Sequence, residues 1–371
     1  MNDVPVQDGM LWPTREEALQ APRGDIELAQ CPACSHIWNR RFDIGRLRYD
    51  REYTFSLHHS STYNLFIQNL AERLVGTHNI RDRRIVEIAC GGGDFLRLLC
   101  RLGRNVGFGI DPSVDPGASI QDVTFINGLF SEEYSYLEPD FICCRHVLDQ
   151  LDNPANFVRM IHRAIAQTNK VPVVYFEVPN GTRVFENSLV WNVIYEKSSW
   201  FSAPSISRLF ERSGFQVLRV TPCYVDGQYL GLEASPLSTG GQSSGKHPDN
   251  PPTSRADPAR FDAEYQTTVR MWKEKIGVMA SASRRVLVWG SGSAAITFLA
   301  SIQRHDTLKY VVDINPVRQG KFIPIGGQRV VAPDFLHEYT PDIVLISNRT
   351  YESEIVGQVR AMGFNCTFEC I

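Results

Sequence analysis

The chain has 371 residues, of which 43% are hydrophobic and 21% charged, and its formal net charge is −3. This length allows two or three domains, and the composition is that of a soluble globular protein. No basic run indicates a nucleic-acid-binding face, no apolar stretch reaches membrane-spanning length, and the first residues lack a signal-peptide pattern. The nine cysteines suggest no disulfide framework. We therefore expect a cytoplasmic protein with reduced thiols and without nucleic-acid or membrane partners.

Residues 1–75 form a front section with two polar features. Cys31-Pro-Ala-Cys34 is a C-x-x-C pair of the kind that holds half a zinc site. A complete site needs two more ligands and the chain has no second C-x-x-C pair, so the alternatives are zinc and a turn of two reduced thiols. Residues 49–60, rich in Tyr, Ser and His, either line the cofactor or substrate pocket or form a solvated connector. We place Tyr53 of this segment at the cofactor.

The most informative stretch is Ile85–Asp94. An apolar run ends abruptly in three glycines, Gly91 to Gly93, and apolar residues at helical spacing follow over 95–102. This order predicts a strand, a glycine turn and a helix. Glycine permits the positive φ values of a tight turn and lets a ligand approach the backbone, and the first N–H groups of the helix are unpaired. The turn therefore predicts a binding site.

Acidic residues surround this turn. Glu87 precedes it, Asp94 follows it, and Asp111 ends the next predicted strand, where a carboxylate can accept hydrogen bonds from both ribose hydroxyls. These acids would repel a pyrophosphate, and Leu96 stands where a dinucleotide fingerprint has its last glycine. The layout resembles that of class I methyltransferases. We expect the cationic cofactor S-adenosylmethionine, bound by Glu87, Gly91, Gly93 and Asp111.

Residues 76–235 are interpreted as one alternating α/β domain. The turn Tyr224–Gln228 contains Asp-Gly and predicts an antiparallel hairpin at the end of this domain. A terminal hairpin on a parallel sheet is the seven-strand methyltransferase arrangement, in which ligands bind outside the carboxyl ends of the strands. The predicted strands lie near 85–90, 106–110, 123–126, 140–145, 171–178, 216–224 and 228–234, and the helices near 93–102, 154–167 and 203–213.

Two loops at those carboxyl ends carry the candidate catalytic residues. Arg145 and His146 follow the fourth strand, and a later loop over 191–202 combines aromatic residues with Tyr195, Glu196 and Lys197. Loops that mix aromatic and ionisable groups above a cofactor sheet usually face the substrate. We expect Arg145 at the cofactor and the other four residues at the reacting atoms, although each could instead be a solvated surface group.

The rest of the chain predicts a linker and a second unit. Residues 236–258 are almost free of apolar side chains, and 259–371 begin with an amphipathic helix and continue as a small, half-sized Rossmann-like unit. Strands are predicted near 285–289, 309–315 and 341–347, with a helix near 351–362. The glycine turn at Gly290 could bind a dinucleotide, but such a turn alone is a weak signal. A scaffold or substrate-docking role is favoured.

Together these parts resemble the three-part C-methyltransferases, whose best known members act on nucleotide-linked keto-deoxysugars in antibiotic pathways. The resemblance covers nearly the whole chain and is most specific in Trp289–Ser293, Val312–Pro316, Gln319–Pro324 and Pro341–Val344. It implies a class I methyltransferase core between a zinc-knuckle front part and a Rossmann-like C-terminal domain. It also implies S-adenosylmethionine as cofactor and a small-molecule substrate of natural-product or sugar type.

The chain departs from this family at two positions that would supply histidines. Gln150 replaces one, and Lys197 ends the element that reads Tyr-Glu-His in the family. C-methylation beside a ketone needs a base, and histidine suits that role because its pKa lies near working pH. We expect rewritten acid/base residues, with Tyr195, Glu196 and Lys197 as candidates. The alternatives are a methyltransferase fold with changed chemistry and a dinucleotide-dependent oxidoreductase using the Gly290 turn.

Overall fold

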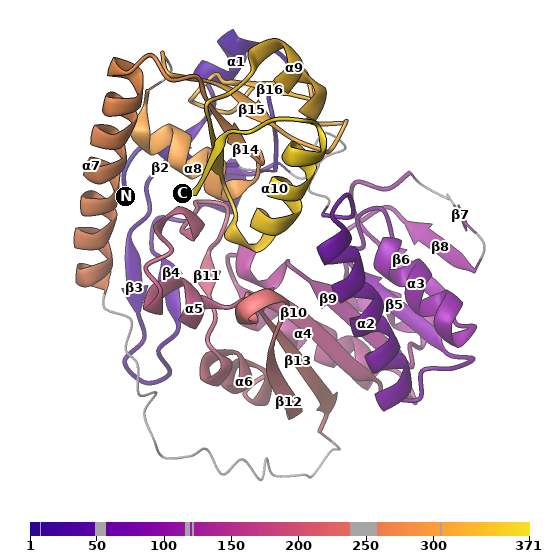
Figure 1. Ribbon diagram of the computed structural model, residues 1–371. Coiled ribbons are helices and arrows are strands. Elements are labelled where there is room, and N and C mark those ends of the chain that lie inside the picture. Colours follow the sequence, from indigo (N-terminus) through magenta and orange to yellow (C-terminus); the bar gives the residue numbers. More distant parts are fainter. Residues whose placement is uncertain (8, 49–56, 116–118, 121, 238–257, 305) are drawn as a thin grey trace.

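Two lobes make up the computed structural model (Figure 1). The structure describes residues 1–7, 9–48, 57–115, 119–120, 122–237, 258–304 and 306–371. The lower lobe in Figure 1 holds the large mixed sheet with its helices, and the upper lobe combines the two ends of the chain. The predicted linker over 236–258 lies almost entirely outside the described residues, as does Tyr53.

The lower lobe is built on an eight-stranded sheet with the order β12-β13-β10-β9-β5-β6-β8-β7. β13 runs antiparallel to both of its neighbours, β7 runs antiparallel to β8, and the other adjacent strands are parallel. The strands are β5 (Arg84–Ile88), β6 (Val106–Ile110), β7 (Ser119–Ile120), β8 (Val123–Ile126), β9 (Phe141–Arg145), β10 (Val173–Pro179), β12 (Phe215–Cys223) and β13 (Tyr229–Pro236). Apart from the two-residue edge strand β7, this is the seven-strand methyltransferase arrangement, and the predicted fold is confirmed.

Neighbouring residues along the central strands pack into different apolar clusters, one on each face of the sheet. Ile85 and Phe141 pack with the helices α2 (Ser61–Thr77) and α3 (Asp94–Gly103). Val86 and Ile142, one position further along, pack instead with α4 (Pro154–Ala166) and α6 (Ala203–Glu211). Successive side chains of a strand point to opposite faces of a sheet, so a sheet covered on both faces has continuous apolar strands. This double burial explains why the strands were readable from the sequence.

The upper lobe contains a five-stranded, fully parallel sheet with the order β16-β15-β14-β17-β18. Its elements are α7 (Pro258–Ser281), β14 (Val286–Trp289), α8 (Ser293–Ile302), β15 (Leu308–Val312), β16 (Arg329–Val331), α9 (Leu336–Tyr339), β17 (Ile343–Ile346), α10 (Glu352–Ala361) and β18 (Thr367–Cys370). The three strands predicted from the sequence correspond to β14, β15 and β17. The prediction of a half-sized unit is wrong, because the sheet has five strands. The two missed strands, β16 and β18, have three and four residues, too few for a periodic signal.

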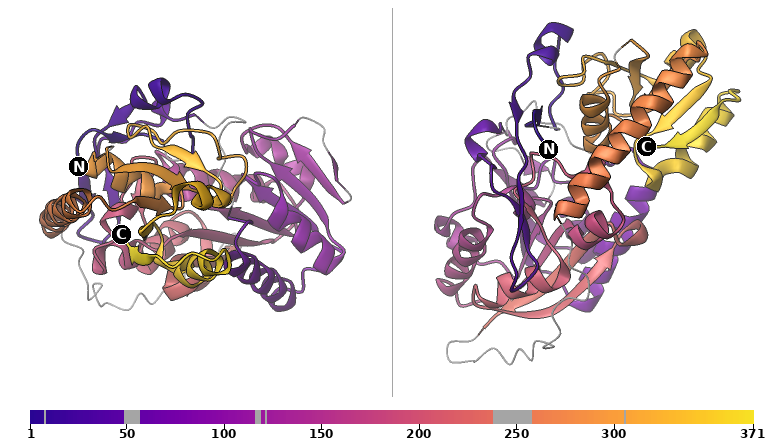
Figure 2. Two further views of the ribbon diagram at one scale, coloured as in Figure 1. Left: turned by 45° about the horizontal axis from the view of Figure 1, so that its top comes forward. Right: turned by 90° about the vertical axis from the view of Figure 1, so that its left-hand side faces the viewer.

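The N-terminal residues pack into the same upper lobe, beside α7 and α8 (Figures 1 and 2). They form α1 (Arg15–Leu19), the pair β1 (Val4–Pro5) and β2 (Arg23–Gly24), and the strands β3 (Leu28–Gln30) and β4 (Ile37–Asn39). A strand from the lower lobe's long loop, β11 (Ser199–Trp200), pairs with β4 and completes a three-stranded sheet. The loop between α5 (Gly181–Glu186) and α6 thus joins the two lobes.

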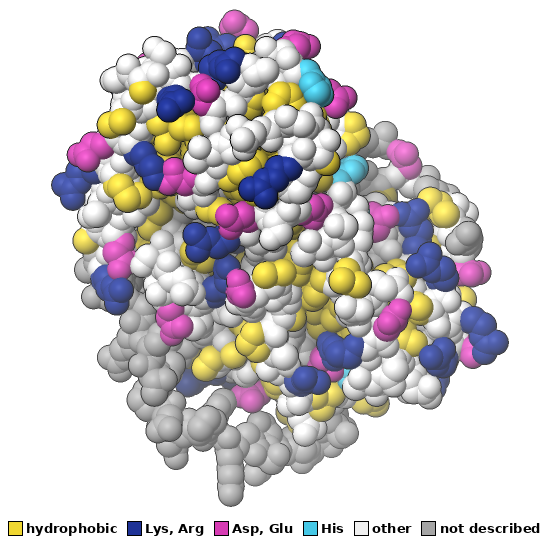
Figure 3. Space-filling model, in the orientation of Figure 1, with side chains coloured by type: hydrophobic (Ala, Val, Ile, Leu, Met, Phe, Trp, Pro, Cys, Tyr) yellow, Lys and Arg dark blue, Asp and Glu magenta, His cyan; other side chains and the backbone are white. Residues whose placement is uncertain are grey.

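Lys and Arg side chains are interspersed with Asp and Glu over both lobes on the face drawn in Figure 3. Among the described residues, no helix combines the length and the apolar character that a bilayer crossing requires.

Candidate functional site

The glycine turn lies at the carboxyl end of β5, and its backbone has the conformation that the sequence predicts. Gly91 and Gly93 have φ values of 51° and 71°, in the left-handed region that favours glycine. A Cβ atom on Gly93 would lie 2.6 Å from the Phe125 ring, whereas no described atom lies within 4 Å of the corresponding position on Gly91. Gly93 is therefore needed for packing, and Gly91 leaves open space through which a ligand can approach.

Asp111, at the end of β6, lies directly beside this turn. Its Oδ2 atom accepts a hydrogen bond from the Gly91 N–H at 2.8 Å, and its Oδ1 atom accepts from the Ser113 N–H at 2.8 Å and hydroxyl at 2.6 Å. The strand order places β5 next to β6, so their carboxyl ends meet at one edge of the sheet. The predicted cofactor residues Glu87, Gly91, Gly93 and Asp111 thus gather at that edge.

Glu87 is the buried acid of the site, with 4% of its surface exposed. Its Oε2 atom accepts a hydrogen bond from the Leu96 N–H at 3.1 Å. Burial, helped by the nearby carboxylates of Asp94 and Asp111, raises the Glu87 pKa to about 8, against the opposing effect of the Arg145 guanidinium. A cationic ligand would compensate this concentration of acids, so the residues fit a sulfonium and ammonium compound better than a pyrophosphate.

Arg145 forms a buried network with Glu177, its partner across β9 and β10. The Arg145 Nη2 atom donates to Glu177 Oε1 and to the Tyr63 hydroxyl, both at 2.9 Å, and its guanidinium lies 4.5 Å from the centre of the Phe95 ring. The Tyr175 hydroxyl donates to the other Glu177 oxygen at 2.9 Å. Burial alone would raise the Glu177 pKa, but Arg145 and a neighbouring histidine lower it to about 2. Glu177, which the sequence analysis left out of the site, holds the predicted residue Arg145 in place.

That neighbouring histidine is His146. Its Nε2 atom lies 2.9 Å from Glu177 Oε1, within ion-pair distance. Its backbone φ is +57°, a conformation that costs energy in a residue with a side chain, and its ring packs edge-on against Tyr229 at 4.5 Å. Backbone strain of this kind collects at functional sites.

Asp149 is an acid that the sequence analysis did not single out. It lies four residues after the end of β9, has 2% of its surface exposed, and its buried Oδ1 atom has no hydrogen-bond partner in the described part of the chain. Burial raises the pKa of this carboxyl group, and the charges of Lys197 and His146 act in the opposite direction. In the sequence Asp149 is one of several polar residues of this loop, with Gln150 and Asp152 close by, so the signal was not specific.

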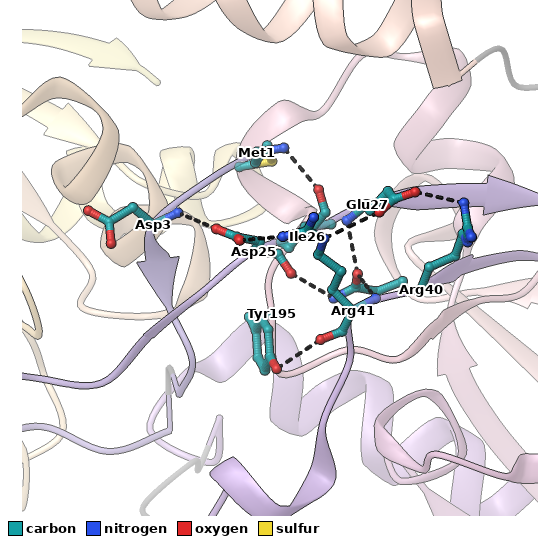
Figure 4. A network of polar contacts seen from close by, with 9 residues as sticks. Met1, Asp3, Asp25, Ile26, Glu27, Arg40, Arg41 and Tyr195 are labelled. Carbon is teal, nitrogen blue, oxygen red and sulfur yellow. Dashed lines mark hydrogen bonds and ion pairs between the residues drawn. The ribbon is translucent and has the colours of Figure 1, made fainter.

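Tyr195 and Glu196 lie away from this cluster. The Tyr195 hydroxyl donates to the Arg41 carbonyl oxygen and accepts from the Asp43 N–H, both at 3.1 Å, and its side chain is buried in the core of the upper lobe (Figure 4). Glu196 Oε2 accepts from the Gly9 N–H at 3.2 Å. Of the three loop candidates, Lys197 is the one whose charge reaches Asp149. Tyr195 and Glu196 lie in a turn closed by a hydrogen bond from the Lys197 N–H to the Ile194 carbonyl oxygen, and these three neighbours in sequence do not share one site.

The expected zinc site is not supported. Within the described ranges, no group of three or more metal-binding side chains exists, so nothing completes the pair Cys31 and Cys34. The nearby His36 packs its ring 4.8 Å from that of Phe201, and burial lowers its pKa to about 4. The histidine serves in packing, and the two thiols are free.

The second glycine turn is filled by side chains of the protein itself. The buried Arg318 donates from Nε to the Ser291 hydroxyl at 2.8 Å and from Nη2 to the Ser291 carbonyl oxygen at 2.6 Å. The Ser291 N–H in turn donates to Asp313 Oδ2 at 3.0 Å. Arg318 occupies the space beside Ser291 that a dinucleotide at the Gly290 turn would need, so the geometry disfavours an oxidoreductase.

Comparisons with known proteins identify two family domains in the chain. Residues 58–220 match the family model of a methyltransferase domain, and residues 255–366 match that of a C-methyltransferase C-terminal domain. No curated protein sequence matches the chain. The methyltransferase match and the strand order identify the chain as a class I S-adenosylmethionine-dependent methyltransferase with S-adenosylmethionine as its cofactor.

Among solved structures, the chain is similar to several methyltransferases. The Burkholderia thailandensis 1,6-didemethyltoxoflavin-N1-methyltransferase has 13% identity and a TM-score of 0.37, covering 57% of this chain and 100% of its own. Magnesium protoporphyrin IX methyltransferase from Synechocystis PCC 6803 has 15% identity and a TM-score of 0.36, covering 47% of this chain and 84% of its own. A methyltransferase from Aquifex aeolicus has 13% identity and a TM-score of 0.35, covering 50% and 100%. At such values the likenesses reveal nothing about the substrate.

Proposed function

We propose that this class I methyltransferase methylates a carbon atom of a small-molecule carbon acid, with Asp149 as the base. The match of residues 255–366 to a C-methyltransferase C-terminal domain supports carbon as the acceptor atom. The observation that carries the choice of base is the buried Asp149 carboxyl group, which has an oxygen without a hydrogen-bond partner among the described residues. A natural product or a sugar with an acidic C–H bond would fit this chemistry.

The cofactor supplies an electrophilic methyl group when it is bound. Glu87 and Asp111 would hold its cationic and ribose parts at the edge of the sheet, and the open backbone at Gly91 would let it approach. These roles follow from the acids and the φ values of the turn, and they involve three of the six cofactor residues predicted from the sequence.

The substrate carbon must lose a proton for methylation. In our proposal the Asp149 carboxylate takes that proton, the electron pair of the broken C–H bond moves into the neighbouring carbonyl group, and the ammonium of Lys197 stabilises the resulting oxygen charge. A carboxyl group with a raised pKa is a stronger base than an ordinary one when it is ionised. His146 completes the polar surroundings of Asp149. This set replaces the two family histidines that the sequence lacks.

A methyl-transfer assay tests the proposal. S-adenosylmethionine with a ¹³C-labelled methyl group is incubated with a panel of small carbon acids, and the ¹³C chemical shift of the product distinguishes C–CH₃ from O–CH₃ and N–CH₃. We expect a C–CH₃ signal together with an equal amount of S-adenosylhomocysteine. Asp149→Asn should lower kcat about 10²- to 10⁴-fold, the usual contribution of a general base.

The matched control is Asp152→Asn, which changes an exposed acid three residues further along the same loop and should leave kcat unchanged. An O–CH₃ or N–CH₃ product would contradict C-methylation. Full activity in the Asp149→Asn variant would contradict the assignment of Asp149 as the base. Product formation with S-adenosylhomocysteine in place of the methyl donor would favour the alternative of a methyltransferase fold with changed chemistry.

A further inference from the structure

An acid of the upper lobe caps a helix of the lower lobe. Glu354, in the first turn of α10, accepts hydrogen bonds at Oε2 from the Ser60 hydroxyl at 2.9 Å and from the Thr62 hydroxyl at 3.1 Å. Its Oε1 atom lies 3.4 Å from the Ser61 N–H. All three donors belong to the start of α2, almost 300 residues earlier in the chain. In Figures 1 and 2, α10 reaches down to that end of α2.

The start of α2 needs such a partner. Ser60 is the N-cap residue, and its hydroxyl oxygen accepts from the Tyr63 N–H at 3.3 Å while the hydroxyl proton goes to Glu354. The first N–H groups of a helix lack partners within the helix, and a carboxylate there is favoured by the helix dipole. The first turn of α2 contains no acid of its own, so Glu354 supplies the charge.

The same turn of α2 contacts residues of the proposed cofactor site. The Tyr63 hydroxyl accepts from Arg145, whose charge acts on Glu87. His58, just before the helix, has its Nε2 atom 3.8 Å from Oδ2 of Asp94, the acid that follows the glycine turn. The His58 and Tyr63 rings pack edge to face at 5.3 Å. A shift of this turn would therefore move contacts on both sides of the glycine turn.

Two further hydrogen bonds join the lobes next to the Glu354 contact. The Tyr224 hydroxyl donates to the Tyr351 hydroxyl at 2.9 Å, and the Thr350 hydroxyl donates to Gln228 Oε1 at 3.0 Å. Tyr224 has φ 60° and ψ 168°, a backbone conformation that is costly for any residue other than glycine. Its strained backbone holds the ring against Phe66 of α2, 4.8 Å away.

The geometry points to Glu354 as a positioning residue for the cofactor site: it fixes the start of α2 and thereby couples the C-terminal domain to S-adenosylmethionine binding. No contact of Glu354 with the cofactor is needed, because its effect passes through Ser60, Thr62 and Tyr63. The inference rests on the cofactor site proposed above. It gives the C-terminal domain a role in cofactor affinity in addition to any contact with the substrate.

Calorimetric titration of the full chain with S-adenosylmethionine tests this coupling. Glu354→Ala should raise the Kd about five- to twentyfold, within the usual range of coupling between sites. Thr62→Val removes one donor to Glu354 and leaves the N-cap serine intact, so it should raise the Kd by a smaller factor. The double variant should bind S-adenosylmethionine no more weakly than Glu354→Ala alone does, because both changes remove the same contact. Glu338→Gln, at an exposed acid on α9, is the matched control and should bind as the parent does.

Coupling between two sites is reciprocal, which separates positioning from general destabilisation. S-adenosylmethionine should therefore slow amide hydrogen exchange in α10 of the parent and not in α10 of Glu354→Ala. A Kd of that variant within twofold of the parent, or equal protection of α10 in both proteins, would overturn the inference. Asp111→Ala tests the site itself: if it binds S-adenosylmethionine as the parent does, the proposed cofactor site fails, whatever Glu354 does.

Discussion

Glu87 is the residue whose protonation should decide how tightly the cofactor binds. Its pKa of about 8 means that the group is largely neutral at pH 7 in the free protein. A bound cation favours the carboxylate and so lowers this pKa, and binding must then release a proton wherever the pH lies between the two values. Proton release makes affinity rise with pH, by up to about tenfold per unit, until the pH passes the pKa of the free protein.

We therefore expect the Kd for S-adenosylmethionine to fall as the pH is raised from about 6 to about 8. Titrations in two buffers with different ionisation enthalpies should show a net release of protons. Glu87→Gln cannot ionise, so this variant should bind more weakly and with little dependence on pH over that range. An affinity that is constant or falls with rising pH in the parent would remove Glu87 from the cofactor site.

Asp149 and Tyr195 illustrate what could not be predicted at the residue scale. Residue type and loop position favoured Tyr195, yet its hydroxyl group bonds to the backbone of the N-terminal segment, 152 and 154 residues distant in sequence. Asp149 became a candidate through its burial and the orientation of its side chain, which depend on packing among distant segments. Glu354 reaches the site from the other lobe. Such contacts leave no periodic or local pattern in the sequence.

At the scale of elements, the glycine turn was predictable because its requirements are local. The strand, the positive φ values and the helix all lie within the twenty residues from Arg84 to Gly103, as does Glu87. The positions of the parallel strands were accessible for the same reason, since each strand is a buried apolar run bounded by polar turns. The short strands β11, β16 and β18 were missed, because their pairing partners and not their sequences define them.

The two end glycines of this turn should respond differently to alanine. Gly91→Ala meets open space, so it should cost about 1–2 kcal/mol for its positive φ while strongly weakening S-adenosylmethionine binding. Gly93→Ala has the same backbone cost and also drives a methyl group into the Phe125 ring, which should add about 1–3 kcal/mol. Urea unfolding compared with calorimetric titration separates the two effects. Equal losses of stability in both variants would contradict this assignment.

At the scale of the whole molecule, the loop between α5 and α6 connects the lobes, because it starts in the lower lobe and packs into the core of the upper lobe. Trp191, on this loop, packs edge-on against Tyr265 of α7 and Phe298 of α8, with ring centres 6.2 and 5.3 Å away. The same apolar cluster contains residues of β4 and of the N-terminal strands. The two ends of the chain therefore share one core, and the loop that bears Lys197 is anchored in it.

Trp191→Ala should consequently loosen both ends of the chain together. Truncation of a buried tryptophan costs about 3–5 kcal/mol, and a shared core must lose that stability as one cooperative unit. Hydrogen exchange followed by mass spectrometry should show faster exchange in β3, β4 and α8 by similar factors. Phe176→Ala, a truncation in the lower lobe's core, should instead speed exchange in the large sheet and leave α8 protected. If Trp191→Ala accelerated exchange in α8 and left β3 and β4 unchanged, the N-terminal strands would have to be stabilised by contacts other than this common core.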